Sequence, residues 1–80
     1  MKYETARRIA RIKALRYCGI VITGESQTND AWVFSLGAKS GEIITANLPM
    51  FVFDKEGNGF RQVRLPSKEG FAILNGERPI

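Results

Sequence analysis

Residues 3–17 read YETARRIARIKALRY, and this stretch carries the clearest structural pattern in the chain. It lacks Gly and Pro and is rich in good helix formers, so a helix is predicted over residues 3–16. At about 100° per residue, one narrow arc of that helix carries Tyr3, Ala6, Ala10, Ala14 and Tyr17, with Ile9 and Ile12 beside it. Because the arc is mostly alanine, the helix backbone can lie close to a sheet.

The opposite arc of the same helix is basic. Arg7, Arg8 and Arg11 project together there. The first 17 residues hold six Lys and Arg against one acid, whereas the rest of the chain holds six against seven. The formal net charge of +4 therefore belongs to the first segment. Such an asymmetry predicts a basic face that meets a polyanion or an acidic protein surface.

Beyond the helix, the apolar residues recur with a period of two, which is typical of strands. Strands are predicted over residues 18–23, 32–36, 43–48, 51–53 and 60–65. Gly24 is expected to close the first of them, and residues 25–30 are expected to form a polar loop. Residues 37–41 have the length and composition of a hairpin loop.

Residues 67–76 admit two structures. Ser67 followed by KEGFAIL, with Gly76 after it, fits a short capped helix. FAIL followed by Asn75 and Gly76 fits a type I′ hairpin equally well, because Asn-Gly supplies two residues with positive φ. Gly70 and the short length of the segment favour the strand.

The order of elements predicts an α+β fold, in which the N-terminal helix packs on a small antiparallel sheet, or a partly open barrel, of about five strands. A chain of 80 residues allows a single domain over residues 1–80, because domains usually run to about 100–150 residues. An exposed edge strand in so small a sheet makes a homodimer a reasonable expectation.

The location is expected to be cytoplasmic. The longest strongly apolar run, residues 17–22, is far below the ~20 residues of a transmembrane helix, and no apolar segment follows the basic N-terminus as in a signal peptide. No membrane contact is expected. A single cysteine excludes an intramolecular disulfide, which suits a reducing compartment.

The aromatic residues have two interpretations. Five of them recur at strand spacing: Trp32, Phe34, Phe51, Phe53 and Phe60. They could stack on nucleic-acid bases, but a domain this small needs them in its core, and the core interpretation is favoured. Phe60 shares its expected face with Gln62 and Arg64, so a second contact patch is predicted beside Arg61.

Catalysis is not expected. The chain has no His, and therefore no imidazole base, no Ser-His or Cys-His pair and no His metal ligand. Cys18 falls in an apolar strand and is interpreted as an inert core residue. Residues 37–41 lack the spacing of a Walker loop, and residues 54–59 lack the ligand series of a calcium loop. A ribonuclease that uses only Lys, Arg, Tyr and Glu would need Tyr3 and Tyr17 exposed near the arginines. Both tyrosines lie on the helix arc that is expected to be buried, so this activity is not expected either. Neither a cofactor nor a metal is predicted.

The sequence therefore predicts a small, non-enzymatic accessory or regulatory protein that binds nucleic-acid phosphates through its N-terminal helix. The main contacts are expected from Arg7, Arg8 and Arg11, with extensions from Lys13, Arg16, Arg61 and Arg64. The alternative is an interaction module, such as an inhibitor or adaptor carried by a mobile element. It would dock on an acidic partner protein through the same helix or through an exposed sheet edge.

Overall fold

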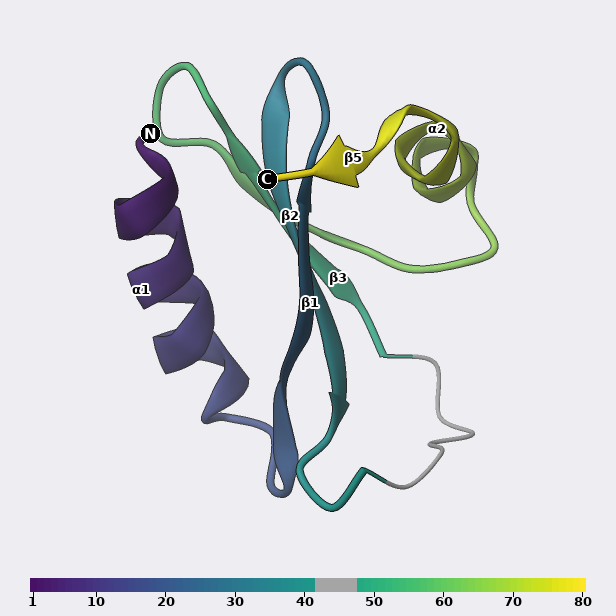
Figure 1. The fold of residues 1–80 in the computed structure, drawn as a ribbon. Helices are drawn as coiled ribbons and strands as arrows, with labels where there is room; N and C mark the ends of the chain where they lie inside the picture. Colours follow the sequence, from purple (N-terminus) through teal and green to yellow (C-terminus); the bar gives the residue numbers. More distant parts are fainter. Residues whose placement is uncertain (42–47) are drawn as a thin grey trace.

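The computed structural model describes residues 1–41 and 48–80, and its elements follow the chain in the order shown in Figure 1. They are α1 (Tyr3–Ala14), β1 (Ile20–Gln27), β2 (Ala31–Ala38), β3 (Met50–Asp54), β4 (Phe60–Val63), α2 (Lys68–Gly76) and β5 (Arg78–Pro79). Within the described residues, the strands form one antiparallel five-stranded sheet in the order β4-β3-β2-β1-β5. The sheet is open rather than closed into a barrel, and the predicted α+β class is confirmed.

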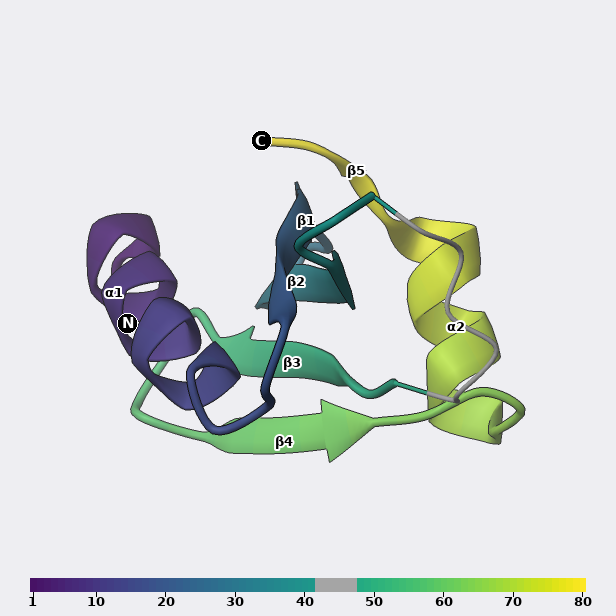
Figure 2. The same ribbon diagram turned by 90° about the horizontal axis from the view of Figure 1, so that it is seen from below.

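The two helices lie on opposite sides of the sheet (Figure 2). On the α1 side, a cluster joins the helix alanines to Phe34, Phe51 and Phe53. On the α2 side, a second cluster joins Ile73 of the helix to the following strand residues: Ala31, Val33, Met50, Val52 and Val63. Because successive residues of a strand point to opposite faces, the run MFVF in β3 supplies both clusters and is buried throughout.

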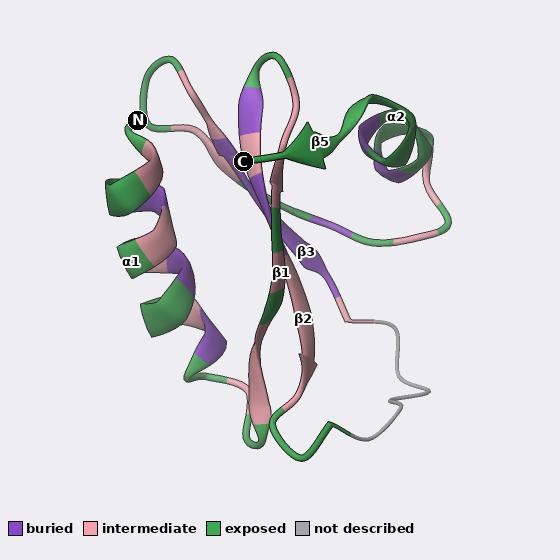
Figure 3. Cartoon of the chain, viewed as in Figure 1, coloured by how far each residue is buried: buried purple, intermediate pink, exposed green. Residues whose placement is uncertain are grey.

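Helix α1 ends at Ala14, two residues earlier than predicted, and Leu15 is its C-cap. The alanine arc is confirmed, because Ala6, Ala10 and Ala14 are all buried against the sheet. Figure 3 shows this inner side of α1 buried and its outer side exposed. Ile12 lies outside the contact and is 60% exposed, so the buried stripe is narrower than the apolar pattern indicates.

Strand β1 continues through Gly24 to Gln27, so the loop expected over residues 25–30 is wrong for residues 25–27 and right for residues 28–30. The register between β1 and β2 shifts between Ile22 and Gly24, which marks a β-bulge at Thr23. Because of this extra residue, Glu25 lies opposite Phe34 on the α1 side of the sheet. Gly37 gives the bulge room, since a Cβ atom there would lie 2.6 Å from Cγ2 of Thr23.

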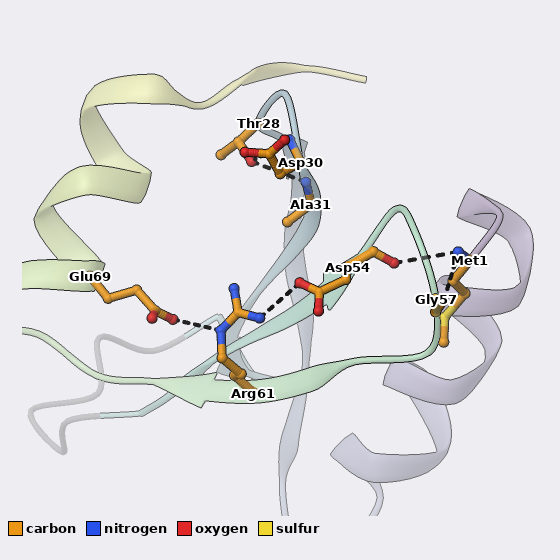
Figure 4. Close-up of polar contacts among 8 residues, drawn as sticks. All are labelled: Met1, Thr28, Asp30, Ala31, Asp54, Gly57, Arg61 and Glu69. Atoms are coloured by element: carbon orange, nitrogen blue, oxygen red, sulfur yellow. Dashed lines mark hydrogen bonds and ion pairs between the residues drawn. The ribbon is translucent and has the colours of Figure 1, made fainter.

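The reversal between β1 and β2 is a tight turn rather than a long loop. The Thr28 backbone N–H donates to the Ala31 carbonyl at 2.9 Å. The Thr28 hydroxyl accepts from the backbone N–H groups of Asp30 and Ala31 at 3.3 and 3.1 Å, as Figure 4 shows. A polar composition therefore indicated the turn correctly but made it too long.

Three further expectations concern Cys18 and two of the predicted strands. Cys18 precedes β1 and is exposed, so its interpretation as a buried core residue is wrong. The strand expected over residues 43–48 falls, except for Leu48, outside the described residues. The strand expected over residues 60–65 is confirmed as β4, which is shorter.

The C-terminal segment is a helix, and the preference for a strand over residues 71–74 is wrong. The Ser67 side chain accepts from the Gly70 backbone N–H at 2.9 Å and caps α2. Gly70 is buried there, and an added Cβ would lie 2.7 Å from a methyl of Leu65. The glycine therefore serves close packing rather than breaking the helix. Strand β5, which the sequence did not predict, pairs with Ser26 and Gln27 of β1.

The N-terminal amino group is tied to the turn between β3 and β4. It donates to the carbonyl oxygens of Asp54 at 3.4 Å and of Gly57 at 3.0 Å (Figure 4). The Trp32 indole N–H donates to the Met1 carbonyl at 2.9 Å and anchors the start of α1 on β2. In the described part of the chain, neither helix is long and apolar enough to cross a membrane.

Candidate nucleic-acid interface

The outward face of α1 presents most of the basic side chains that the sequence singled out. Arg8, Arg11 and Arg16 are exposed. Among the described residues, their guanidinium groups have no ion-pair or hydrogen-bond partner. The reason is geometric: the alanine arc holds the inner side of the helix against the sheet, which leaves the basic arc in solvent.

Three arginines line one shallow hollow on this face. Arg7, Arg8 and Arg11 surround it together with Glu4 and Ile12, and its volume is about 270 Å³. Guanidinium groups bind phosphate oxygens through charge-assisted and often bidentate hydrogen bonds, so three of them around one hollow suit an anionic ligand. The sequence predicted this trio as the main contact set, and the structure brings its members together.

Arg7 differs from the other two because it has an acidic partner. Its Nε donates to Oε1 of Glu25 at 3.1 Å, and the Tyr3 hydroxyl donates to the same oxygen at 2.5 Å. The bulge at Thr23 makes this contact, since it turns Glu25 toward α1. The pair is partly exposed, and such pairs contribute less than about 1 kcal/mol to stability. Arg7 therefore lies at the boundary between the helix surface and β1.

The hydrogen bond to Glu25, together with partial burial, raises the pKa of Tyr3 above its ordinary value of 10.0. A raised pKa means that the neutral phenol stabilises the fold below about pH 10 and that this contribution is lost as the pH rises through the folded-state pKa. In Tyr17→Phe, where Tyr3 is the remaining tyrosine, we expect phenolate absorbance to appear above pH 10. Adding Glu25→Ala is expected to lower that midpoint, and an unchanged midpoint would contradict the contact.

Lys13 lies on the other flank of α1, toward β4. Its Nζ is 4.2 Å from the ring centroid of Phe60, which is a cation–π distance. The Tyr17 hydroxyl donates to the Gln62 side chain at 3.4 Å on the same side. Lys13 is half-buried, and its ammonium group lies against Phe60 on the flank of α1 that faces β4, away from the three arginines.

Arg61 lies on the opposite side of the sheet from α1, because it pairs with Val52 in a register that directs both toward α2. Its Nη1 donates to Asp54 at 2.8 Å and its Nε to Glu69 at 2.9 Å (Figure 4). These two hydrogen bonds raise the pKa of Arg61, which stays protonated. The side chain joins β3, β4 and α2. The structure therefore does not bring Arg61 to the α1 arginines. Arg64, the other predicted contact in this region, follows the end of β4 and is exposed.

The aromatic residues lie mainly in the core. Phe34, Phe51 and Phe53 are fully buried, as the favoured interpretation predicted. Phe60 packs on the Phe53 ring with centroids 4.9 Å apart, on the face opposite to Arg61. Phe60 and Gln62 share the α1 side of the sheet, as the predicted stripe requires, but Arg61 lies on the other face and does not join that stripe.

Sequence reasoning missed a groove between α1 and β1. Its volume is about 410 Å³, and Leu15, Ile20 and Ile22 contribute to its lining. Its charged lining consists of Arg7, Arg11 and Glu25. Its one signal in the sequence is Leu15, an apolar residue off the alanine arc, which the structure leaves 81% exposed. The groove depends on which strand lies at the edge of the sheet, and local patterns do not contain that information.

In the part of the chain that the structure describes, no three His, Cys, Asp or Glu side chains are grouped so that they could hold a metal ion. The chain matches no protein-family model, no curated protein and no solved structure. Function is therefore inferred from the geometry and charge of α1 and its surroundings.

Proposed function

We propose that this chain binds nucleic acid through the phosphate backbone and that the outward face of α1 is the contact surface. The observation that supports the proposal is the hollow surrounded by Arg7, Arg8 and Arg11. Arg8 and Arg11 have no side-chain partner among residues 1–41 and 48–80 and are free to contact phosphates. Arg16 and Lys13 extend the surface beyond the helix end and toward β4.

The proposed binding is largely independent of sequence. A helix of 12 residues is about 18 Å long and can meet several phosphates. Contacts to phosphates position a protein but do not read bases. The aromatic rings nearest to α1 are packed against the core, so base stacking on this face is not part of the proposal. The proposed role is that of a non-enzymatic accessory or regulatory protein in the cytoplasm.

Arg8→Ala/Arg11→Ala is expected to weaken binding to a labelled DNA duplex about tenfold at low salt. The slope of log affinity against log salt concentration should become shallower by about 0.9 for each phosphate that the protein no longer neutralises. Fluorescence anisotropy between about 50 and 200 mM salt measures both quantities. Duplex and single-stranded DNA and RNA of equal length form separate arms, and their ranking identifies the preferred nucleic acid.

The matched control is Lys68→Ala/Arg78→Ala, which removes the same charge from exposed positions in α2 and β5. We expect it to change the affinity less than about twofold, because both positions lie away from α1. Circular dichroism checks that each variant stays folded. Absence of duplex binding at the lowest salt, or equal losses of affinity in the two double variants, would refute the proposal.

The second candidate is docking on a partner protein. The observation that favours it is the groove beside β1, which combines aliphatic lining with arginines. That surface is distinct from the outward hollow, although both include Arg7 and Arg11.

A further inference from the structure

Strand β1 has an open edge. One side of it pairs with β2 along its length, whereas β5 covers the other side only at Ser26 and Gln27. Between Ile20 and Glu25, no strand of the described residues lies beside this second side. An uncovered edge presents backbone N–H and C=O groups to which another strand can pair.

The register identifies which backbone groups face outward. The Lys39 N–H donates to the Gly19 carbonyl, so this pair is hydrogen-bonded in the ladder between β1 and β2. In an antiparallel ladder, hydrogen-bonded and non-hydrogen-bonded pairs alternate. It follows that Ile20 and Ile22 direct their carbonyl groups, and Ile22 its N–H, away from β2. After the bulge the same alternation directs the backbone groups of Glu25 outward.

The groove lies directly beside these groups. The side chains of Ile20 and Ile22 line it, and Leu15 of α1 forms part of the other wall. A strand added to β1 would place every second side chain on the α1 side of the sheet. Aliphatic side chains at two such positions of the added strand would bury apolar surface against Leu15, Ile20 and Ile22.

We propose that this edge binds an extended segment of a partner protein, antiparallel to β1, with aliphatic side chains two residues apart and flanking carboxylates. The edge already accepts an antiparallel strand, because β5 pairs with it at its far end. Charge favours an acidic segment: Arg7, Arg11 and Glu25 line the groove, Glu25 is already paired with Arg7, and Arg11 has no partner among the described residues. This docking site goes beyond the phosphate contacts proposed above.

The same charges disfavour a second copy of the chain as the occupant. Antiparallel pairing of two β1 edges requires a two-fold axis perpendicular to the sheet, which would bring two α1 helices together on one face. Arg7 and Arg11 of both copies would then lie near each other without a compensating acid beyond Glu25. An acidic segment would instead place a carboxylate beside the unpaired Arg11, while Glu25 stays paired with Arg7.

The probe is the labelled peptide Asp-Glu-Val-Thr-Val-Glu-Asp, titrated with the full chain by fluorescence anisotropy. We expect saturable binding that is at least about tenfold weaker when Lys replaces the acids or Ser replaces the valines. Leu15→Glu is expected to weaken binding of the original peptide about tenfold, because it places a carboxylate in the groove. Ile12→Glu is the matched control on the same helix, since Ile12 is exposed but lies off the groove, and a change below about twofold is expected.

Hydrogen exchange locates the contact. The bound peptide should slow exchange of the Ile22 and Glu25 amides, which face outward, and Leu15→Glu should abolish that protection. Absence of saturable binding, or equal effects of Leu15→Glu and Ile12→Glu on the peptide, would overturn the proposal.

Two other outcomes would assign the groove to a different occupant. Sedimentation that shows a dimer dissociated by Leu15→Glu would assign it to a second copy. Duplex binding that is lowered by Leu15→Glu at least as much as by Arg8→Ala, without peptide binding, would assign it to nucleic acid. Arg8 does not line the groove, so loss of duplex binding in Arg8→Ala with intact peptide binding separates this site from the proposed function.

Discussion

Phe34→Ala is expected to lower the free energy of unfolding by about 3–5 kcal/mol, the usual cost of truncating a buried aromatic residue. Phe34 is fully buried at the middle of the α1 side of the sheet. Its ring lies 5.7 Å from Phe53 and 6.3 Å from Tyr3, measured between centroids. The truncation therefore removes packing against both the neighbouring strand and the helix. Since small domains are stable by only about 5–15 kcal/mol, the variant should be close to unfolding.

Urea denaturation followed by circular dichroism measures this decrease in stability, and the fluorescence of Trp32, the single tryptophan, gives a second probe. Phe71→Ala is the matched control, because Phe71 lies on α2 and is 53% exposed. Its cost should stay below about 1 kcal/mol. Similar decreases in both variants would mean that Phe34 does not occupy the centre of the core.

Ala10→Leu is expected to destabilise the fold by about 1–3 kcal/mol, because added methyl groups overpack a filled core. Ala10 is fully buried between α1 and the phenylalanines of the sheet. Its small side chain lets the helix backbone approach the strands, and leucine would push the helix outward. Because α1 also carries the proposed phosphate contacts, its position on the sheet connects stability to function.

The control for this substitution is Ala72→Leu on the exposed surface of α2, which should change stability by less than about 0.5 kcal/mol. Urea denaturation of the two variants provides the comparison. If leucine is tolerated at residue 10 as well as at residue 72, the alanine arc does not make the close contact described above.

Local pattern was sufficient for α1 and for the strands that bury alternate residues. The alanine spacing over residues 6–14 repeats every four positions, and one helix face collects it without any long-range information. The strand predicted over residues 51–53 lies within β3, although burial of this strand on both faces depends on α2 covering the second side. The arginine trio of the hollow was predictable for the same reason as the alanine arc, because helical periodicity places all three together.

The errors share a cause in contacts between distant residues. Gly70 favoured a strand in the sequence, yet its lack of a side chain admits Leu65 and allows α2 to pack. Gly24 suggested a strand end, yet β1 continues past it because β2 provides a partner through the bulge. Competition between local propensity and tertiary packing explains both cases.

The order of residues alone was enough to predict the first helix, the two-residue period of the main strands and the concentration of positive charge at the start of the chain. Strand order and register were needed for everything that joins distant positions. They pair Arg7 with Glu25, hold Arg61 between two acids, and leave one edge of β1 open beside a groove. Side-chain periodicity is a property of neighbours along the chain, whereas these contacts depend on which faces and edges the folded sheet brings together.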